Sequence, residues 1–293
     1  MDRKKGNIYL QASLTAISAM VAETATFPID ITKTRLQLYG ESISAASRAH
    51  AFRTAIDIVK GEGLMGLYKG LSPALIRHLF YTPIRIACYE NLRNAAPEGN
   101  KALIGGVSGI LGQIVASPAD LIKVRLQADG RLVNQGLQPR YKGTMDALIT
   151  VVRIEGFWGL WKGVFPNVQR AFLVNMGELA IYDHAKQLIL RKQICDDNIY
   201  AHTLSSIMSG LSATTLSCPA DVVKTRMMNQ STHRECTAVY RNSFDCLMKT
   251  VKIEGIWALW KGFFPTWARL GPWQFMFWVS YEKLRSLAGL SSF

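Results

Sequence analysis

The chain has 293 residues, a formal net charge of +13 and a hydrophobic fraction of 49%, with 19% charged residues. A strongly basic chain often binds nucleic acid, but here the basic residues fall in short loops between long apolar stretches, as in a membrane protein. The five cysteines form no CxxC pair, and no Walker loop or GxGxxG motif occurs. A disulfide framework and the common phosphate-binding enzymes are therefore disfavoured, and we expect all five cysteines to be reduced and structural.

Long apolar stretches and shorter amphipathic ones alternate in a regular order. A stretch of ~20 apolar residues is long enough to cross a bilayer as a helix. We expect spanning helices at residues 8–27, 73–93, 102–117 and 202–218, and two more that end at Lys186 and Arg285. We expect amphipathic surface helices at residues 52–60, 144–153 and 242–252. The polar residues 1–5 run directly into the first apolar stretch, so we expect no cleavable signal.

One motif occurs three times, at intervals of about a third of the chain, and indicates a triplicated architecture. Its proline, acid, lysine and arginine are Pro28, Asp30, Lys33 and Arg35, then Pro118, Asp120, Lys123 and Arg125, then Pro219, Asp221, Lys224 and Arg226. The proline should kink its helix near the end, and the acid and the lysine share one helix face. Three such helices arranged around an axis predict a ring of ion pairs, in which each acid binds a lysine from another copy.

Three further landmarks recur in step with this motif. They are a Glu-Gly pair that begins at Glu62, Glu155 and Glu254, an aromatic-Lys-Gly group that begins at Tyr68, Trp161 and Trp260, and a Tyr-acid-x-x-basic group that begins at Tyr89, Tyr182 and Tyr281. We therefore divide the chain into repeats at residues 1–99, 100–195 and 196–293.

With these landmarks the chain resembles the mitochondrial carrier family, and the resemblance covers nearly its whole length. It implies an all-α membrane protein, in which six transmembrane helices form a three-fold pseudosymmetric barrel with three short surface helices on the matrix side. It also implies a multi-pass location in the mitochondrial inner membrane, and transport by alternating access to a central site that lies between two gates.

The resemblance assigns residues to both gates. On the matrix side, Asp30, Asp120 and Asp221 would pair with Lys123, Lys224 and Lys33, above glutamine braces at Gln37 and Gln127. The third brace position holds Met228, which should weaken this gate. On the cytosolic side, Glu90, Asp183 and Glu282 would pair with Lys186, Arg285 and Arg93, braced by Tyr89, Tyr182 and Tyr281.

Three glycines, each at the start of the second spanning helix of a repeat, and one glycine before a surface helix match the family's cardiolipin positions. They are Gly70, Gly163, Gly262 and Gly143. Backbone N–H groups exposed at a helix start can bind a lipid phosphate. The companion Tyr-x-Gly of the surface helices ends at Gly143 in repeat two, but is Tyr240-Arg-Asn242 in repeat three.

Arginines within the apolar helices are the candidate substrate site, because charges inside a bilayer are costly and usually functional. Arg77, Arg170 and Arg269 each lie 13 residues before the terminal acid of their repeat, which places them roughly 20 Å deeper in the membrane. We call them the contact arginines. Three arginines that converge on one cavity would select an anion, unless internal carboxylates such as Glu23 and Glu178 neutralise them.

Within the family the pattern most resembles the uncoupling-protein subgroup, closest to the plant type. The residues that support this are the contact arginines with Arg85, and Asn175, Glu178, Trp273 and Glu23. The resemblance implies a fatty-acid-dependent proton leak that purine nucleotides inhibit, with Glu23 and Glu178 handling protons. These carboxylates would equally well serve only to pair with arginines. Trp273 is placed to stack on a base, to face lipid or to pack internally.

Other functions remain open at this point. A metabolite exchanger of the same fold would move dicarboxylates, acidic amino acids or inorganic anions without a physiological proton leak. A basic repeat protein that binds nucleic acid would be soluble, against which the uncharged stretch at residues 102–117 argues. No recurring nucleophile or metal cluster indicates an enzyme. We expect no metal and no cofactor beyond cardiolipin as a structural lipid, and a functional monomer.

Overall fold

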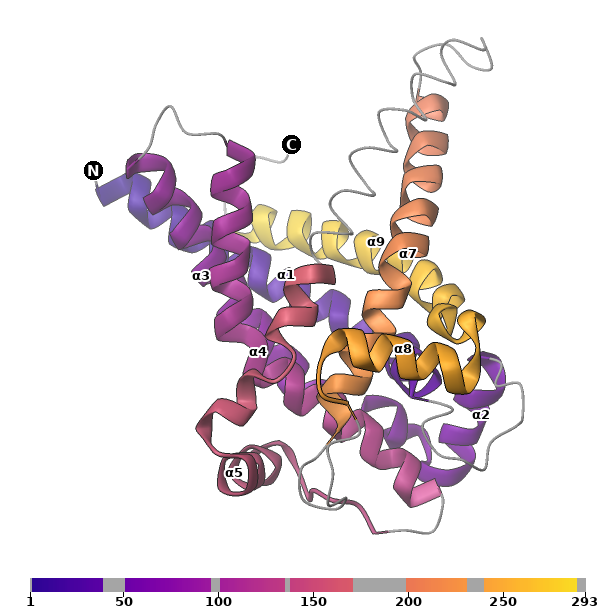
Figure 1. Ribbon diagram of the computed structural model, residues 1–293. Helices are drawn as coiled ribbons and strands as arrows, with labels where there is room; N and C mark the ends of the chain where they lie inside the picture. Colours follow the sequence, from indigo (N-terminus) through magenta and orange to yellow (C-terminus); the bar gives the residue numbers. More distant parts are fainter. Residues whose placement is uncertain are drawn as a thin grey trace.

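The computed structural model describes residues 2–38, 51–95, 101–134, 138–170, 199–230 and 240–288, and within these ranges it is helical and contains no strand (Figure 1). The long helices are α1 (Asp2–Gln37), α3 (Leu71–Ala95), α4 (Lys101–Asn134), α7 (Ile199–Asn229) and α9 (Phe263–Leu287). The short helices are α2 (Ala51–Glu62), α5 (Thr144–Glu155) and α8 (Ser243–Glu254). Residues 164–170 are also helical and begin the second long helix of repeat two, which is equivalent to α3 and α9.

Each short helix leads into a single 3₁₀ turn, and the same order repeats three times. The turns are η1 (Leu64–Tyr68), η2 (Phe157–Trp161) and η3 (Ile256–Trp260). The order of long helix, short helix, turn and long helix therefore agrees with the plan predicted from the repeated landmarks. The short helices lie together at the lower end of the molecule in Figure 1.

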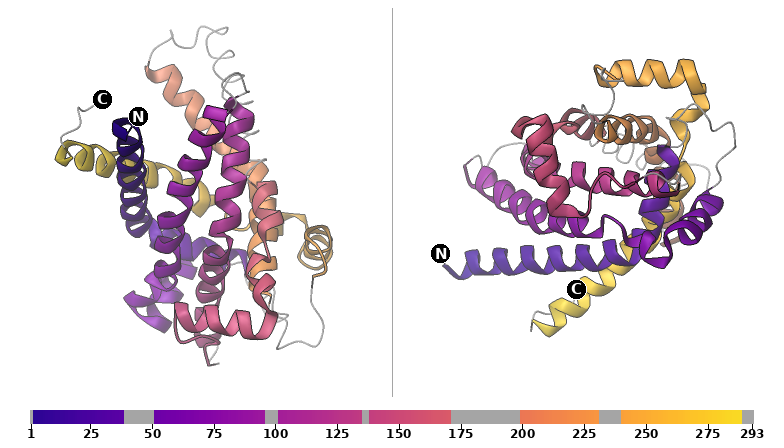
Figure 2. Two further views of the ribbon diagram at one scale, coloured as in Figure 1. Left: turned by 90° about the vertical axis from the view of Figure 1, so that its left-hand side faces the viewer. Right: turned by 90° about the horizontal axis from the view of Figure 1, so that it is seen from below.

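The long helices pack around a common axis. α1 contacts α3 on one side and α9 on the other, and α4 contacts α3 and α7. α9 also contacts α7. Figure 2 shows α9 crossing α1, so that the last repeat packs against the first.

The first long helix of each repeat continues through its motif proline, as expected from the shared helix face of the acid and the lysine, and it extends well beyond the apolar spans expected to end at residues 27 and 117. α1 runs nine residues past Pro28, to Gln37, and α4 continues past Pro118 to Asn134. A proline inside a helix leaves the carbonyl four residues earlier without its backbone donor. In two repeats, a side chain from the 3₁₀ turn of the same repeat supplies that donor.

That donor is the tryptophan of the aromatic-Lys-Gly group. Trp161 Nε1 donates to the Ile114 carbonyl at 2.9 Å, and Trp260 Nε1 donates to the Thr215 carbonyl at 3.2 Å. Both acceptors lie four residues before a motif proline. In repeat one, the Tyr68 ring instead stacks over Phe27, with ring centroids 6.3 Å apart. The proline motif and the aromatic-Lys-Gly group are thus two halves of one structural contact.

Two of the described helical segments, Leu10–Gln37 and Ile104–Gly130, are long and apolar enough by composition to cross a membrane. Six spanning helices were expected. α3 does not reach the same mean hydropathy because it carries Arg77 and Arg85 within its span and Glu90 and Arg93 near its end. Side chains that face a polar cavity lower the mean hydropathy of a helix without preventing it from spanning.

Candidate functional site

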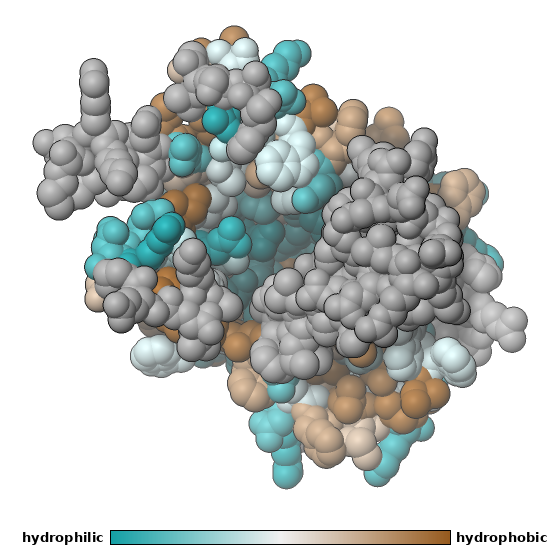
Figure 3. All heavy atoms as spheres, turned by 90° about the horizontal axis from the view of Figure 1, so that it is seen from above, coloured by the Kyte–Doolittle hydropathy of each residue, from teal (hydrophilic) through white to brown (hydrophobic). Residues whose placement is uncertain are grey.

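The site lies in a hollow between the helices. Viewed from above, the molecule is hollowed, and the floor of the hollow is hydrophilic (Figure 3). The motif acids and lysines, whose six side chains come from α1, α4 and α7, lie close together and form ion pairs with one another. We call these six residues the signature ring. They are Asp30, Lys33, Asp120, Lys123, Asp221 and Lys224.

The signature ring forms the three cyclic ion pairs that the repeat pattern predicts. Lys33 Nζ lies 2.6 Å from Asp221 Oδ2, and Lys123 Nζ lies 2.7 Å from Asp30 Oδ2. Lys224 Nζ lies 3.5 Å from Asp120 Oδ2, the longest of the three. All three aspartates are buried. The ring closes the floor of the hollow, and its function as a gate remains a prediction.

Each contact arginine binds one aspartate of the ring. Arg77 Nε lies 3.4 Å from Asp120 Oδ1. Arg170 pairs with Asp221, and Arg269 pairs with Asp30. Every ring aspartate therefore binds one lysine and one contact arginine, each from a different repeat. From the sequence, only Glu23 and Glu178 had been considered as internal partners for these arginines. The aspartates of the ring are the partners that this reasoning missed.

Glu23 forms a second layer directly above the ring. Its side chain is fully buried, and its oxygens lie 2.8 Å from Lys123 Nζ and 2.6 Å from Arg269 Nη2. Lys123 and Arg269 also bind Asp30, so these two cations hold two carboxylates together. His78 Nε2 lies 3.5 Å from Glu23 Oε2. Glu23 is thus paired with cations, which was one of its two expected roles.

Neutral amides hold Asp120 in addition to its two cations. Gln113 Nε2 donates to Asp120 Oδ2 at 3.0 Å, and Asn167 Nδ2 donates to the same oxygen at 3.3 Å. Gln113 lies five residues before Pro118, as Glu23 lies five residues before Pro28. Comparing the repeats at this position would have identified Gln113 as a residue of the cavity.

The two glutamines beneath the ring behave differently. Gln127 Nε2 donates to Asp30 Oδ2 at 3.2 Å, so it does contact an ion pair of the ring. Gln37 Oε1 instead accepts a hydrogen bond from Thr225 Oγ1 at 2.8 Å. Met228 occupies the third position, is fully buried and packs in a hydrophobic cluster with Leu121. The ring is therefore braced asymmetrically.

Two other candidate ligand residues lie nearer the mouth of the hollow. Arg85 is exposed, and its guanidinium lies over the Tyr81 ring, 5.7 Å from the centroid. Trp273, one turn after Arg269, stacks on Phe277, which in turn stacks on Tyr281. The Trp273 Nε1 atom is buried and has no hydrogen-bond partner. Internal packing thus accounts for the Trp273 ring, while its N–H group is left to bind an additional acceptor.

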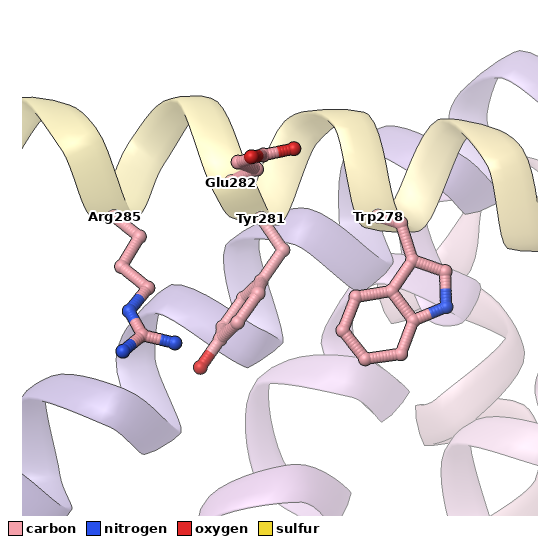
Figure 4. A pocket seen from close by; sticks show the side chains of 4 residues that line it. All are labelled: Trp278, Tyr281, Glu282 and Arg285. Atoms are coloured by element: carbon pink, nitrogen blue, oxygen red, sulfur yellow. The ribbon is translucent and has the colours of Figure 1, made fainter. Parts of the chain in front are cut away.

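The residues predicted for the cytosolic gate are only partly described. Tyr281, Arg285 and Trp278 project from one side of α9 and Glu282 projects from another (Figure 4). The four line a cavity of about 300 Å³. Glu282 and Arg93, both within the described ranges, do not form the expected ion pair with each other, whereas the signature ring is closed.

Some predicted site residues lie outside the described residues. They are Asn175, Glu178, Tyr182, Asp183 and Lys186. The expected partners of Glu90 and Arg285 are Lys186 and Asp183, respectively, so neither of these two pairs can be examined. Tyr89, which should brace Glu90, is partly buried near the end of α3.

The backbone requires the glycines that precede the second long helix of each repeat. Gly70, Gly163 and Gly262 have φ values of 88°, 103° and 90°, a region that other residues rarely adopt. A Cβ on Gly70 would also lie 3.3 Å from the Lys123 carbonyl oxygen. Gly143, by contrast, has an extended backbone with φ of −178°. The positive φ values and the close approach of the three helix starts to α4, α7 and α1, respectively, explain the first three glycines. Lipid binding remains a prediction for all four.

The last arginine of each motif forms a second three-fold set, which the sequence had not assigned to a function. Arg35, Arg125 and Arg226 are at most 2% exposed. Each pairs with the glutamate of its own repeat's Glu-Gly pair, at 2.5, 2.8 and 2.6 Å. Each also donates through Nε to a carbonyl of another repeat, at Gln127, Met228 and Gln37, respectively. These arginines therefore bind the surface helices to the ring and the repeats to one another.

The glutamates of these pairs are strongly ionised. Burial raises the pKa of Glu155, but hydrogen bonds and charges from Arg125 and then Lys162 lower it more, so that its pKa lies below the ordinary value. The same balance lowers the pKa of Glu62 and of Glu254. Each of the three also binds the lysine of the aromatic-Lys-Gly group, at 2.5–3.0 Å.

We predict that Glu155→Gln destabilises the protein substantially. The substitution leaves the Arg125 guanidinium, 1% exposed, without its carboxylate, and breaking a buried pair in this way costs about 3–5 kcal/mol. Thermal unfolding of the purified protein in detergent measures the effect. Asp245→Asn is the matched control, because Asp245 pairs with Lys249 on the exposed surface of α8 and such pairs contribute little. Equal unfolding temperatures for the two variants would contradict the assignment.

We also predict that acid weakens the same set. The lowered pKa values of Glu62, Glu155 and Glu254 mean that their stabilisation is complete above the unfolded-state pKa of about 4.3. It is lost as the pH falls through the lower folded-state pKa values. Unfolding temperatures should therefore fall steeply below about pH 4.5. Glu155→Gln should show a smaller acid-induced fall than the unsubstituted protein.

Comparisons with known proteins agree with this architecture. The family model described as "Mitochondrial carrier protein" matches residues 4–100, 94–193 and 196–291. The chain is 66% identical over 292 residues to mitochondrial uncoupling protein 3 of Arabidopsis thaliana, covering 96% of this chain and 94% of that protein. It is 38% identical to kidney mitochondrial carrier protein 1 of Xenopus laevis, covering 92% of this chain and 95% of that protein. It is 38% identical to mitochondrial uncoupling protein 1 of Arabidopsis thaliana, covering 92% and 90%.

The three family matches fall on the three repeats that carry the signature ring, and the relatives align along nearly the whole chain. Members of this family are transporters rather than enzymes, and membership implies the mitochondrial inner membrane. The chain belongs to the mitochondrial carrier family and is a carrier of the uncoupling-protein type.

Proposed function

We propose that this carrier produces a fatty-acid-dependent proton leak that purine nucleotides inhibit, and that anions cross it through the arginine-lined site by alternating access. The leak would uncouple respiration from ATP synthesis. The observation that carries the proposal is the sharing of each ring aspartate between a lysine of the ring and a contact arginine.

This sharing links anion binding to opening of the ring. An anion in the hollow competes with Asp30, Asp120 and Asp221 for the contact arginines. Bidentate hydrogen bonds between a guanidinium and a carboxylate or phosphate are strong. As the arginines turn to the anion, each aspartate loses one of its two cations, and the lysine pairs that close the floor weaken. The bound anion thereby lowers the cost of opening the matrix side.

Glu23 is the group best placed to take part in proton movement. It is fully buried above the ring and depends on Lys123 and Arg269 for compensation of its charge. If a fatty-acid carboxylate binds Arg269, Glu23 loses part of that compensation, and protonation of Glu23 becomes more favourable. Purine nucleotides would inhibit by occupying the same arginines with their phosphates, and the buried Nε1 of Trp273 would be available to bind an acceptor.

The second candidate function is exchange of small anions without a physiological leak. The same coupling of arginines and ring aspartates favours anion exchange, because opening of the ring by this coupling requires only an anion and no proton-carrying group. The name of the Xenopus relative describes a mitochondrial carrier and does not mention uncoupling. Dicarboxylates, acidic amino acids and inorganic anions are the candidate substrates.

We further propose that one chain suffices and that cardiolipin stabilises it. The contact arginines come from all three repeats of the same chain and converge on one hollow, so a transport path needs no second copy. Gly70, Gly163 and Gly262 lie at the start of the second long helix of their repeats, directly after the surface helix and the 3₁₀ turn. Cardiolipin phosphates would bind the backbone N–H groups there.

Reconstitution of the purified chain into cardiolipin-containing liposomes tests the proposal. Proton flux is recorded with added fatty acid, with and without GDP, and the uptake of labelled malate, aspartate and phosphate is measured in parallel. A fatty-acid-dependent proton flux that GDP inhibits supports the uncoupling function. Fast exchange of an anion without such a flux would establish the exchanger and contradict the leak.

A further inference from the structure

His78 lies at the junction between the anion site and Glu23. It follows Arg77 in α3, and its side chain is buried. Its Nε2 atom lies 3.2 Å from Arg77 Nη2 and 3.5 Å from Glu23 Oε2. Neither the repeat landmarks nor the family resemblance had assigned it to a site. Repeat three has Leu270 immediately after Arg269, so the histidine is not part of the three-fold pattern.

The two neighbours of His78 Nε2 require opposite states of that atom. The arginine can only donate, so Nε2 must carry a lone pair to accept the hydrogen bond from Arg77. The ionised carboxylate of Glu23 can only accept, so Nε2 must carry a proton to donate to it. A single ring nitrogen cannot do both. The state of Nε2 therefore depends on whether Arg77 is turned towards it.

We propose that His78 couples the binding of an anion at Arg77 to the uptake of one proton, so that the carrier moves the anion and the proton together. With an empty site, Arg77 binds Asp120 and donates to His78 Nε2. When an anion takes the guanidinium of Arg77, the lone pair of Nε2 becomes free. A proton from the bulk solution, relayed by cavity water, then binds Nε2 while Nδ1 keeps its own proton, so the ring becomes an imidazolium whose Nε2–H group donates to Glu23.

The charges around His78 support this sequence. The groups that face it are Arg77 on its own helix, Glu23 on α1, Lys123 on α4 and Arg269 on α9, which pairs with Glu23. Arg77 and Lys123 oppose a proton at Nε2 while the site is empty, and Arg269 compensates the Glu23 carboxylate that would otherwise favour it. An incoming anion neutralises part of that positive charge and leaves Glu23 less compensated, so the proton becomes favourable. When the anion leaves on the other side, Arg77 returns to Nε2, and the proton is released to that side.

This inference rests on the proposed anion transport and adds proton coupling to it. His78 binds the coupled proton in this account, and its contacts with Arg77 and Glu23 determine when the proton is bound and released. A histidine suits the task because its ordinary pKa lies within the physiological range, so that modest changes in the surrounding charge add or remove its proton.

The test measures protons and anions in the same vesicles. The full chain is reconstituted in cardiolipin-containing liposomes that enclose a pH-sensitive dye, with the membrane potential clamped by potassium and valinomycin. Uptake of labelled malate, aspartate and phosphate is recorded together with proton uptake. Unsubstituted protein should take up about one proton with each anion beyond the protons that the anion itself carries, between about pH 6 and 8.

His78→Gln is the informative variant, because its side-chain amide can accept from Arg77 and donate to Glu23 but cannot take up a proton. We expect labelled anion uptake to continue and the ratio of protons to anions to fall about fivefold or more. The pH dependence of uptake should flatten over the same range. His202→Gln, near the start of α7, is the matched control and should keep the ratio of the unsubstituted protein.

The outcomes separate the inference from the function on which it rests. An unchanged ratio in His78→Gln would overturn the role of His78. Anion uptake without additional protons in the unsubstituted protein would overturn the coupling and leave anion transport standing, and this result does not depend on whether a variant folds. Neither anion uptake nor fatty-acid-dependent proton flux in the unsubstituted protein would overturn the proposed function, and the coupling with it.

Discussion

Lys123→Glu abolishes transport in our account, because Lys123 is the cation that joins the ring to the layer above it. Its Nζ lies 2.7 Å from Asp30 and 2.8 Å from Glu23. The substitution places a third carboxylate beside these two and leaves Arg269 to compensate all three. Breaking a buried ion pair costs about 3–5 kcal/mol even without an added like charge. Uptake of labelled anion into proteoliposomes should fall to the level of protein-free liposomes.

Two further variants make this prediction specific. Lys249→Glu reverses the charge of a lysine whose partner, Asp245, lies on the exposed surface of α8, and it should leave uptake intact. Adding Asp30→Lys to Lys123→Glu restores opposite charges within the pair. The rescue should be partial, because Asp30 also binds Arg269 and the new lysine would repel that guanidinium. No rescue at all would contradict the pairing of residues 30 and 123 as part of the gate.

Arg170→Gln should likewise remove anion transport and nucleotide inhibition together. Arg170 pairs with Asp221, which also binds Lys33 at 2.6 Å. Glutamine keeps a polar side chain of moderate length but loses the charge and the two-pronged donor geometry that recognise an anion. The cavity would then present two contact arginines instead of three, and the coupling between the anion and Asp221 would be absent.

Both readouts are needed to interpret this variant. Labelled anion uptake and the GDP sensitivity of proton flux should fall together, because one arginine serves both ligands. Arg153→Gln makes the same exchange at an exposed position of α5 and should change neither. Normal uptake and normal GDP inhibition in Arg170→Gln would remove Arg170 from the site.

The repeated motif predicted a ring in which each acid pairs with a lysine of another repeat, and the family resemblance supplied which lysine pairs with which aspartate. Asp30, Asp120 and Asp221 occupy equivalent positions on three helices, so a three-fold arrangement leaves few ways to pair them with the three lysines. The same reasoning located the contact arginines at one depth. It also gave the order of long and short helices, because each helix type has its own length and hydrophobic pattern.

The contacts between these sets could not be predicted, because they depend on side-chain reach. Arg77, Arg170 and Arg269 were expected to face an anion, yet each extends to a ring aspartate of another repeat. Sequence spacing gives the depth of an arginine and not the direction of its long side chain. The contact that supports the helix at the motif proline was missed for a related reason, since in two repeats the compensating donor comes from a tryptophan 40 or more residues further along the chain.

Residues that break the three-fold pattern were the hardest to find. His78 and Asn167 have no matching residue type in the other repeats, so a search for repeated landmarks passes over them, whereas Gln113 matches Glu23 in position but not in residue type. They nevertheless contact Glu23 or Asp120. In a symmetric scaffold the repeated residues make the gate, and we infer that the residues that differ between repeats adapt it to a particular substrate.

The most direct test of alternating access through the arginine site is uptake of labelled malate, aspartate or phosphate into liposomes with and without unlabelled anion inside. If an anion must take the contact arginines from the ring before the ring opens, uptake saturates with external anion and accelerates when the same anion is present on the other side. That acceleration is the result we predict. Uptake that rises linearly with concentration and is indifferent to internal anion would describe a pore, and would contradict a gate opened by its substrate.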